Sequence, residues 1–264
     1  MDDTNEDKKA EASQALFDGQ AQTGSQKQSN SLLIAGSIII AGFFIALAII
    51  HTSGKNAPLT SAIVSANNNS SEKTLAVKSI SKDDRILGNF DALVKIIEFS
   101  DTECPYCKMF HATMKKIMDE YGPRGQVAWV YRHYPLEIHP KAQKEAEAAE
   151  CASEQGFSGE GGNLIFWKYI DRVFEVTPSN NGLDPAELTN IAKYLNLHID
   201  EFNVCLNSGK YAERVASQKQ DGENAGAKGT PHSIIIIGNK EALPLEGAMP
   251  YSDLKKIIES ALKI

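Results

Sequence analysis

Two cysteines separated by two residues, Cys104 and Cys107, are the sequence feature that most limits the possible folds of this chain, because of the segments that flank them. Residues 93–99 (LVKIIEF) are mostly apolar and partly β-branched, which predicts a buried strand leading into the CPYC sequence. Residues 108–121 (KMFHATMKKIMDEY) have helical periodicity and lead out of it. Paired thiols between a strand and a helix are typical of a dithiol–disulfide redox site, although an isolated CxxC fits half of a zinc site equally well.

The helical pattern gives the two cysteines different positions. Cys107 shares one apolar face with residues at helical spacing, namely Phe110, Met114, Ile117 and Tyr121. Cys104 lies where the helix begins, followed by Pro105, which suits the first turn. The helix dipole and free N–H groups there favour a thiolate. We therefore expect Cys104 to be an exposed nucleophile and Cys107 a buried thiol that resolves mixed disulfides.

A carboxyl group lies in the strand that leads to the cysteines. Glu98 stands six residues before Cys104, between Ile97 and Phe99. Burial in such a strand would raise its pKa and allow it to exchange a proton with Cys107. The alternative is a carboxylate at the strand end that faces solvent.

A proline near the end of the chain marks a second unusual turn. Thr230 and Pro231 come just before the apolar residues 233–237 (SIIII), which predict a short buried strand. A proline that opens a buried strand suggests a special turn, in which cis X–Pro bonds are favoured. Taken alone the indication is weak, because only about 5–6% of X–Pro bonds are cis.

The order of predicted elements indicates an α/β fold. The chain is expected to run through an extended segment at 75–80, strands at 93–99 and 127–131, helical segments within 139–223 that break near Gly209, a hairpin of 233–237 with 243–246, and a last helix from Tyr251. A strand–helix–strand unit leaves its strands parallel, with helices on both faces of the sheet. Active sites gather at the carboxyl ends of such strands, where Cys104 lies.

The first 72 residues have a different character. Residues 1–30 are polar and acidic, which predicts a disordered tail. Residues 32–50 form an uncharged apolar run of 19 residues, long enough to cross a bilayer as a helix, and we place a transmembrane anchor at 31–50. A cleaved signal peptide would need a basic start and a small-residue cleavage site after the run. Residues 51–72 are rich in Ser, Asn and Ala and predict a flexible linker to a soluble domain at 73–264.

The charges beside the apolar run do not decide its orientation. Lys27 precedes it and Lys55 follows it, and the more distant Lys8 and Lys9 favour a cytoplasmic N-terminus only slightly. The net charge of −7 and the lack of a basic tract argue against nucleic acid as a partner.

From residue 84 to the end, the chain resembles the DsbA-like branch of the thioredoxin superfamily, in particular its membrane-tethered members. The motifs that carry the resemblance are ILGNFDALVKIIEFSDTECPYC, FWKYIDRVFE, CLNSGKY and GTPHSIIIIG. It implies a thioredoxin fold with a helical domain inserted at about 137–226, and no cofactor or metal. It also implies that Glu98 is a buried acid and that Pro231 is cis and packs beside Cys104. Thr230 would then offer backbone hydrogen bonds to a bound polypeptide, with Pro105 and Tyr106 also at the substrate.

This chain departs from the family pattern in three places. Pro-Tyr stands between the cysteines, where the strongest oxidases have Pro-His, so we expect a less oxidising potential. Threonine before the proline is also common among isomerases and reductases. Residues 157–164 (FSGEGGNL) are predicted to be extra loop.

The remaining cysteines, Cys151 and Cys205, fall in two predicted helices of the insertion. Some DsbA-like relatives have a second disulfide at similar positions, which implies a structural disulfide here. Two buried free thiols, or a zinc site made by all four cysteines, are the alternatives. Neither Cys151 nor Cys205 has a Cys or His neighbour at the spacing usual for zinc.

The resemblance implies a thiol–disulfide oxidoreductase, and we expect an oxidase that introduces disulfides into exported polypeptides bearing cysteines, with a quinone-linked membrane protein as its reoxidant. Such chemistry persists outside the cytosol, so we expect a single-pass protein of the inner membrane with a cytoplasmic N-terminus and a periplasmic or other extracytoplasmic domain. A reductase or isomerase with the same fold is the first alternative. A tethered module that binds a metal or substrate without turnover is the second.

Overall fold

The computed structural model describes residues 76–156, 160–238 and 241–263. The chain divides into two units, Met1–Asn69 and Ser70–Ile264, and all described residues belong to the second. The predicted tail, the anchor at 31–50 and the linker at 51–72 therefore lie outside the described residues. Within the ranges just given, no helix combines the length and the apolar character that a membrane span needs.

A five-stranded sheet is the centre of the described structure, with the strand order β1-β3-β2-β4-β5. Its members are β1 (Arg85–Gly88), β2 (Val94–Ser100), β3 (Val127–His133), β4 (His232–Ile237) and β5 (Glu241–Glu246). The predicted parallel pairing of the first two long strands is confirmed, because β2 and β3 run parallel. The other neighbouring strands pair antiparallel, including the predicted hairpin of β4 and β5.

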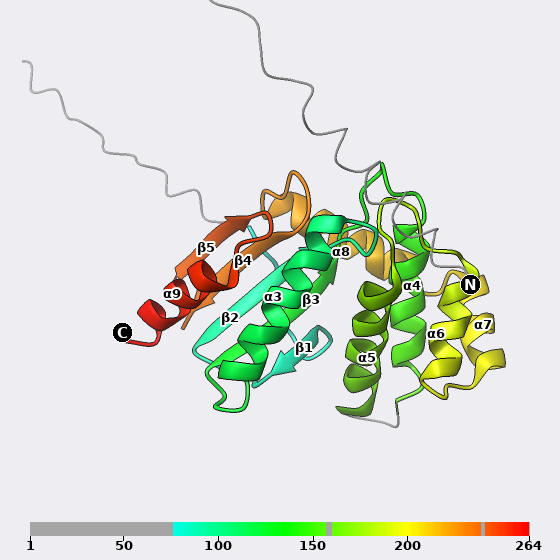
Figure 1. The fold of residues 1–264 in the computed structure, drawn as a ribbon, viewed down its shortest axis with the longest axis horizontal. Coiled ribbons are helices and arrows are strands. Elements are labelled where there is room, and N and C mark those ends of the chain that lie inside the picture. The colour runs from blue at the N-terminus through cyan, green and yellow to red at the C-terminus, as the bar shows by residue number, and fades with distance from the viewer. Residues whose placement is uncertain (1–75, 157–159, 239–240, 264) are drawn as a thin grey trace, which may run out of the picture. The chain divides into compact units, whose positions relative to one another are not determined.

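Helices cover both faces of this sheet, as expected. Helices α3 (Pro105–Tyr121) and α9 (Tyr251–Ala261) contact each other, and α3 packs on β3. Helix α8 (Ala212–Asn224) packs on β2 and β3. The inserted helices are α4 (Ala142–Ser153), α5 (Glu160–Val176), α6 (Ala186–Tyr194) and α7 (Ile199–Ser208). Figure 1 shows these four packed together beside the sheet, with α3 crossing in front of it.

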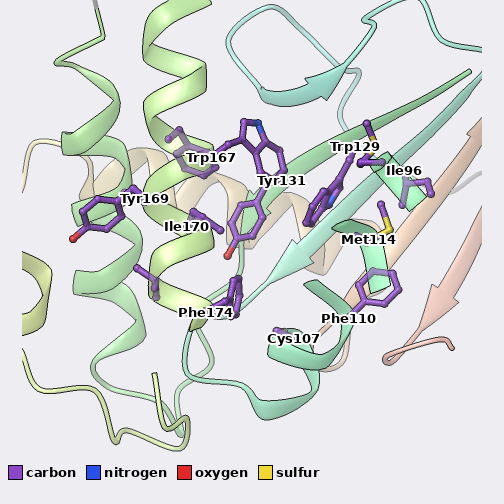
Figure 2. Packing of buried hydrophobic residues seen from close by; sticks show 14 of the residues in the cluster. Ile96, Cys107, Phe110, Met114, Trp129, Tyr131, Trp167, Tyr169, Ile170 and Phe174 are labelled. Atoms are coloured by element: carbon purple, nitrogen blue, oxygen red, sulfur yellow. The ribbon is translucent and has the colours of Figure 1, made fainter. Parts of the chain in front are cut away.

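The alternation of side chains along the strands divides the core in two. Val127, Trp129 and Tyr131 of β3 point to one face and belong to the larger apolar cluster, whereas Val130 belongs to the smaller cluster on the other face. Figure 2 shows residues of the larger cluster, where aromatic side chains of β3 and α5 pack together beside α3. Each buried aromatic side chain stabilises the fold by about 1.5–3 kcal/mol. This cluster also contains both CPYC cysteines.

The first strand of the described residues, β1, was not predicted. The predicted extended segment is described only at 76–80, where the chain forms no strand of the sheet. With four residues, three partly buried and one exposed, β1 is too short to show a period of two in the sequence. It is placed by antiparallel pairing with residues of β3 that are 40 to 46 positions away.

The predicted extra loop at 157–164 is also wrong in part, because α5 begins at Glu160. Glycines made this stretch resemble a loop in the sequence. In the fold, a Cβ atom on Gly162 would lie 2.6 Å from the backbone oxygen of Ser153. A close approach between the end of α4 and the start of α5 therefore requires glycine there, and packing rather than helix propensity sets the start of α5.

A buried carboxylate ties the inserted helices to the sheet. Glu150 of α4 has a fully buried side chain and contacts Arg85 of β1, His133 of β3 and Arg214 of α8. Burial alone would raise its pKa, but His133 and Arg85 together hold the pKa of Glu150 well below its usual range. Removing one partner of such a buried group is strongly destabilising, so Glu150 fixes where α4 lies on the sheet.

Cys151 of α4 and Cys205 of α7 form a disulfide with an S–S distance of 2.00 Å. This is the pairing that the family resemblance implies. Because these two sulfur atoms are bonded to each other, they cannot be zinc ligands together with Cys104 and Cys107.

We predict that the double variant Cys151→Ala/Cys205→Ala loses about 2–4 kcal/mol in the free energy of unfolding, because this disulfide closes a loop between residues 54 apart and restricts the unfolded chain. Urea unfolding followed by circular dichroism measures the loss. In a Cys104→Ser/Cys107→Ser background, where no other disulfide can form, dithiothreitol should lower the stability of the protein to that of the variant and leave the variant unchanged. Equal midpoints for the oxidised parent and the variant would contradict the prediction.

Candidate active site

The CPYC sequence lies at the carboxyl end of β2, where α3 begins. Cys104 is the N-cap of α3 with extended backbone angles, φ −80° and ψ 121°, and its carbonyl accepts the N–H of Lys108 at 3.1 Å. Pro105 occupies the first turn, where its missing N–H costs nothing. Cys104 therefore lies at the positive end of the helix dipole, as the sequence predicted.

Both cysteines are free thiols, and both are buried. The expectation that Cys104 is exposed is wrong, since only 4% of its surface is accessible, against 0% for Cys107. The reason is a turn distant in sequence: the Cys104 thiol lies 3.4 Å from the carbonyl oxygen of Thr230. Cys104 is instead reached through a cleft of about 590 Å³ that it lines together with Pro105, Tyr106 and Thr230.

The two thiols have opposite electrostatic environments. A hydrogen bond from the Cys107 thiol lowers the pKa of Cys104 from 9.0 to about 6, although burial acts in the opposite direction. Burial raises the pKa of Cys107 well above 9.0, and the hydrogen bond to Cys104 and the charges of Cys104 and Glu98 add to the rise. At neutral pH the pair therefore holds one thiolate, at Cys104, and one protonated thiol, at Cys107.

Glu98 lies behind the cysteines in the middle of β2 and has no accessible surface. Its Oε2 accepts a hydrogen bond from the indole N–H of Trp129 at 2.9 Å. Burial raises the pKa of Glu98 to about 7, against the opposing effect of hydrogen bonds from Ser100 and Trp129. The predicted burial and raised pKa are confirmed, and the alternative of a solvent-facing carboxylate is excluded. A part in proton transfer stays a prediction.

The turn before β4 forms the other wall of the site. The peptide bond between Thr230 and Pro231 is cis, as the resemblance implies. Pro231 is buried, and its carbonyl accepts the N–H of Gly247 at 2.9 Å. Tyr106 is 61% exposed at the edge of the cleft. The structure thus gathers Cys104, Cys107 and Thr230 at one place, whereas the Cys151–Cys205 disulfide lies between the inserted helices.

Two acidic residues of the site were not predicted. Asp101 donates its backbone N–H to the Cys107 sulfur at 3.4 Å, and its carboxylate binds the N–H of Leu136 and Nδ1 of His139 at 2.8 and 2.9 Å. Glu103 is fully buried and accepts the N–H groups of Gly182 and Leu183 at 3.2 and 3.1 Å. These carboxylates fasten the segments beside the cleft to the start of α3.

Trp129 was missed as well. To predict its contact with Glu98, one would have to know the register of β2 and β3, which places Trp129 beside Ile96 and Tyr131 beside Glu98. That register depends on the tertiary fold. The contacts by which these two carboxylates hold Leu136, His139, Gly182 and Leu183 join residues 35 to 80 positions apart, so no local sequence pattern predicts them.

Comparison with known proteins identifies the family. A family model described as Thioredoxin matches residues 80–260. The chain is 34% identical over 162 residues to Na(+)/H(+) antiporter NhaA 3 of Salinispora tropica, covering 61% of this chain and 22% of that protein. It is 27% identical over 168 residues to Na(+)/H(+) antiporter NhaA 1 of Mycolicibacterium vanbaalenii, covering 62% and 25%. The chain thus spans about a fifth to a quarter of the length of these curated relatives.

Solved structures agree with the fold. Pseudomonas aeruginosa DsbA2 is 26% identical, with a TM-score of 0.56 over 69% of this chain and 96% of that one. Oxidised BdbD from Bacillus subtilis is 23% identical, with a TM-score of 0.59 over 72% and 98%. DsbA of Chlamydia trachomatis, 15% identical, has a TM-score of 0.59 over 69% and 93%. The last two likenesses concern the fold alone.

The sequence resemblance is therefore confirmed for the fold, including the helical insertion. The family match, the cis-proline turn and the paired thiols with opposite pKa shifts agree with one another. This chain belongs to the thioredoxin family, in its DsbA-like form.

Proposed function

We propose that this protein is a membrane-anchored oxidase that introduces disulfides into exported polypeptides through Cys104 and Cys107. The observation that carries the proposal is the lowered pKa of Cys104, about 6, which results chiefly from the hydrogen bond of Cys107. Stabilising the thiolate stabilises the reduced form of the pair. The disulfide form then gives up its bond readily, which makes it an oxidant.

The exchange balances in two steps. A substrate thiolate attacks the Cys104 sulfur of the enzyme disulfide, and Cys107 leaves as a thiolate that takes a proton from Glu98. A second substrate thiolate then attacks the substrate sulfur of the mixed disulfide and releases Cys104 as a thiolate. Two electrons have passed to the enzyme, and the substrate holds a new disulfide. A quinone-linked membrane protein would remove these electrons.

The proposed substrate contacts follow from the cleft. Pro105, Tyr106 and Thr230 line it, and Pro231 holds the turn that faces Cys104. A polypeptide with an accessible cysteine would lie across these residues, with backbone groups of the turn available for pairing. The exposed ring of Tyr106 offers an apolar contact at the edge.

The proposed location rests on the sequence. Residues 32–50 would anchor the chain in the inner membrane, with the N-terminus in the cytoplasm and the catalytic domain on the periplasmic or other extracytoplasmic side. The Cys151–Cys205 disulfide supports an oxidising compartment for the domain. The antiporter name of the curated relatives belongs to proteins of which this chain covers about a fifth to a quarter, so we propose no ion transport here.

A reductase or isomerase is the second candidate, because Thr230 precedes the cis-proline and no histidine stands between the cysteines. A tethered metal-binding module has less support. Within 76–156, 160–238 and 241–263, no three His, Cys, Asp or Glu side chains are grouped as ligands of one ion.

The redox potential separates oxidase from reductase. We expect the Cys104–Cys107 pair, equilibrated with glutathione buffers and quantified by thiol trapping and mass spectrometry, to have a potential of about −120 to −180 mV. The reason is the stabilised Cys104 thiolate. A Cys104→Ser variant reports any contribution from the other cysteines. A potential near that of thioredoxin, about −270 mV, would instead assign the protein to the reductases.

The reactivity of Cys104 should follow its lowered pKa. Alkylation of the reduced protein by iodoacetamide at Cys104 should rise as pH increases through about 6 and then level off, because only the thiolate reacts. In Cys107→Ala the hydrogen bond is lost, so the midpoint should move upward. A midpoint above pH 8 in the parent protein would remove the basis of the oxidase proposal.

Trapping tests the roles of the two thiols. A Cys107→Ala variant expressed in cells should accumulate mixed disulfides with exported polypeptides, because no second thiol remains to resolve them. Non-reducing gels and mass spectrometry would show the partners. Cys104→Ala is the matched control and should trap none. Equal trapping by both variants would contradict the assigned roles.

A further inference from the structure

Four buried polar side chains meet on the sheet face that carries Cys107. Glu98 and Ser100 come from β2, Tyr131 from β3 and Ser233 from β4, and each is at most 1% exposed. The strand register places Tyr131 and Ser233 directly beside Glu98, one on either side. We call these four residues the Glu98 cluster.

The cluster contains four buried polar atoms that have no hydrogen-bond partner among the described residues. They are Glu98 Oε1, Ser100 Oγ, the Tyr131 hydroxyl and Ser233 Oγ. A buried polar group without a partner costs about 1–3 kcal/mol, and native proteins rarely leave several together. A small rotation of the hydroxyl groups, or one internal water, would let these groups satisfy one another. Trp129 already occupies the other Glu98 oxygen, so Oε1 is the acceptor that is left for the hydroxyl groups.

Tyr131 is within electrostatic reach of both proton-exchanging groups. Burial raises its pKa well above 10, and the charges of Glu98 and Cys107 raise it further, whereas a hydrogen bond with Ser100 lowers it. Ser100 likewise lowers the pKa of Glu98. Tyr131 thus stays protonated and is a donor throughout the working range. Figure 2 shows its hydroxyl directed toward the end of the core where Cys107 lies.

We propose that Tyr131 is a positioning residue for thiol–disulfide exchange: with Ser100 it donates hydrogen bonds to Oε1 of Glu98 and holds that carboxylate to accept the Cys107 proton. The inference rests on the proposed oxidoreductase function. In the step concerned, the Cys107 sulfur attacks Cys104 in a mixed disulfide, its proton passes to Glu98, and the partner leaves as a thiolate with the electrons of the broken S–S bond.

The remaining groups around Glu98 do not supply this function. From β3, Trp129 donates to the other oxygen. From α3, Cys104 acts on the pKa of Glu98 through its charge, and Cys107 is the thiol to be deprotonated. His111, further along α3, bonds Asp171 of α5 at 2.8 Å, and burial lowers its pKa, so it is neutral at pH 7. The α5 side chains of the core cluster carry no charge, among them Trp167, Ile170 and Phe174.

The test isolates the resolving step. Reduced protein is mixed with excess oxidised glutathione, so that Cys104 forms a mixed disulfide quickly. Acid quenching and mass spectrometry then follow the loss of the bound glutathione as Cys107 displaces it. In the parent protein the rate should rise as pH increases through the pKa of Glu98, which burial raises above the usual value of a carboxyl group. Cys104 is in a disulfide throughout this step and does not titrate.

In Tyr131→Phe, which keeps the ring, the carboxylate loses a donor and the pKa of Glu98 should rise. We expect the midpoint of the profile to move up by about one pH unit, which makes the step about tenfold slower below the midpoint. Ser100→Ala should shift the midpoint in the same direction. It serves as the second variant if Tyr131→Phe does not fold, as judged by urea unfolding.

Tyr169→Phe is the matched control, because Tyr169 is equally buried but its hydroxyl bonds the carbonyl of Leu188 at 2.9 Å, outside the cluster. It should leave the midpoint unchanged. In a Glu98→Gln background, which has no carboxylate to position, adding Tyr131→Phe should alter the rate little. A parental midpoint in Tyr131→Phe, or an equal slowing by Tyr131→Phe in the Glu98→Gln background, overturns the proposal. A parent protein that does not exchange with oxidised glutathione refutes the oxidoreductase function itself, which is a separate outcome.

Discussion

The hydrogen bond between the two thiols is the interaction on which the site depends. Its direction follows from the different surroundings of the two sulfur atoms. Cys107 is sealed among apolar side chains of α3 and the sheet and cannot ionise there, whereas Cys104 borders the cleft at a helix N-terminus. The negative charge of the pair is therefore confined to Cys104. The apolar core thus determines which sulfur reacts.

In the proposed reaction, the same core couples electron transfer to proton transfer. Glu98 lies in the low-dielectric region that keeps Cys107 protonated, and its charge raises the pKa of Cys107 further. A carboxylate and a thiolate together in this region would cost much free energy, so in the proposed cycle Glu98 and Cys107 share one proton. This role would explain why an ionisable residue occupies the middle of a buried strand, where an apolar residue would give a more stable fold.

The local parts of this arrangement could be predicted from the sequence, and the distant parts could not. Periodicity is a local property, so the sequence predicted the strand before CPYC, the start of the helix and the apolar face of that helix. The burial of Cys104 depends on Thr230, 126 residues away, and therefore escaped prediction. Strand β1 was too short to leave a pattern, and glycine packing concealed the start of α5. Trp129 finds Glu98 only once the sheet has formed.

The inserted helices and the loops between them contact the short segment that precedes Cys104. Thr102 donates a hydrogen bond to Glu145 of α4 at 2.5 Å, and Glu103 holds the backbone at Gly182 and Leu183. Burial and a hydrogen bond with Glu103 raise the pKa of Glu145 to about 8, so Glu145 keeps its proton at neutral pH. The sheet therefore supplies the chemistry of the thiols, while the insertion is fastened to the residues just before Cys104. Changes in the outer helices can then reshape the cleft without disturbing the thiol pair, provided these carboxyl contacts persist.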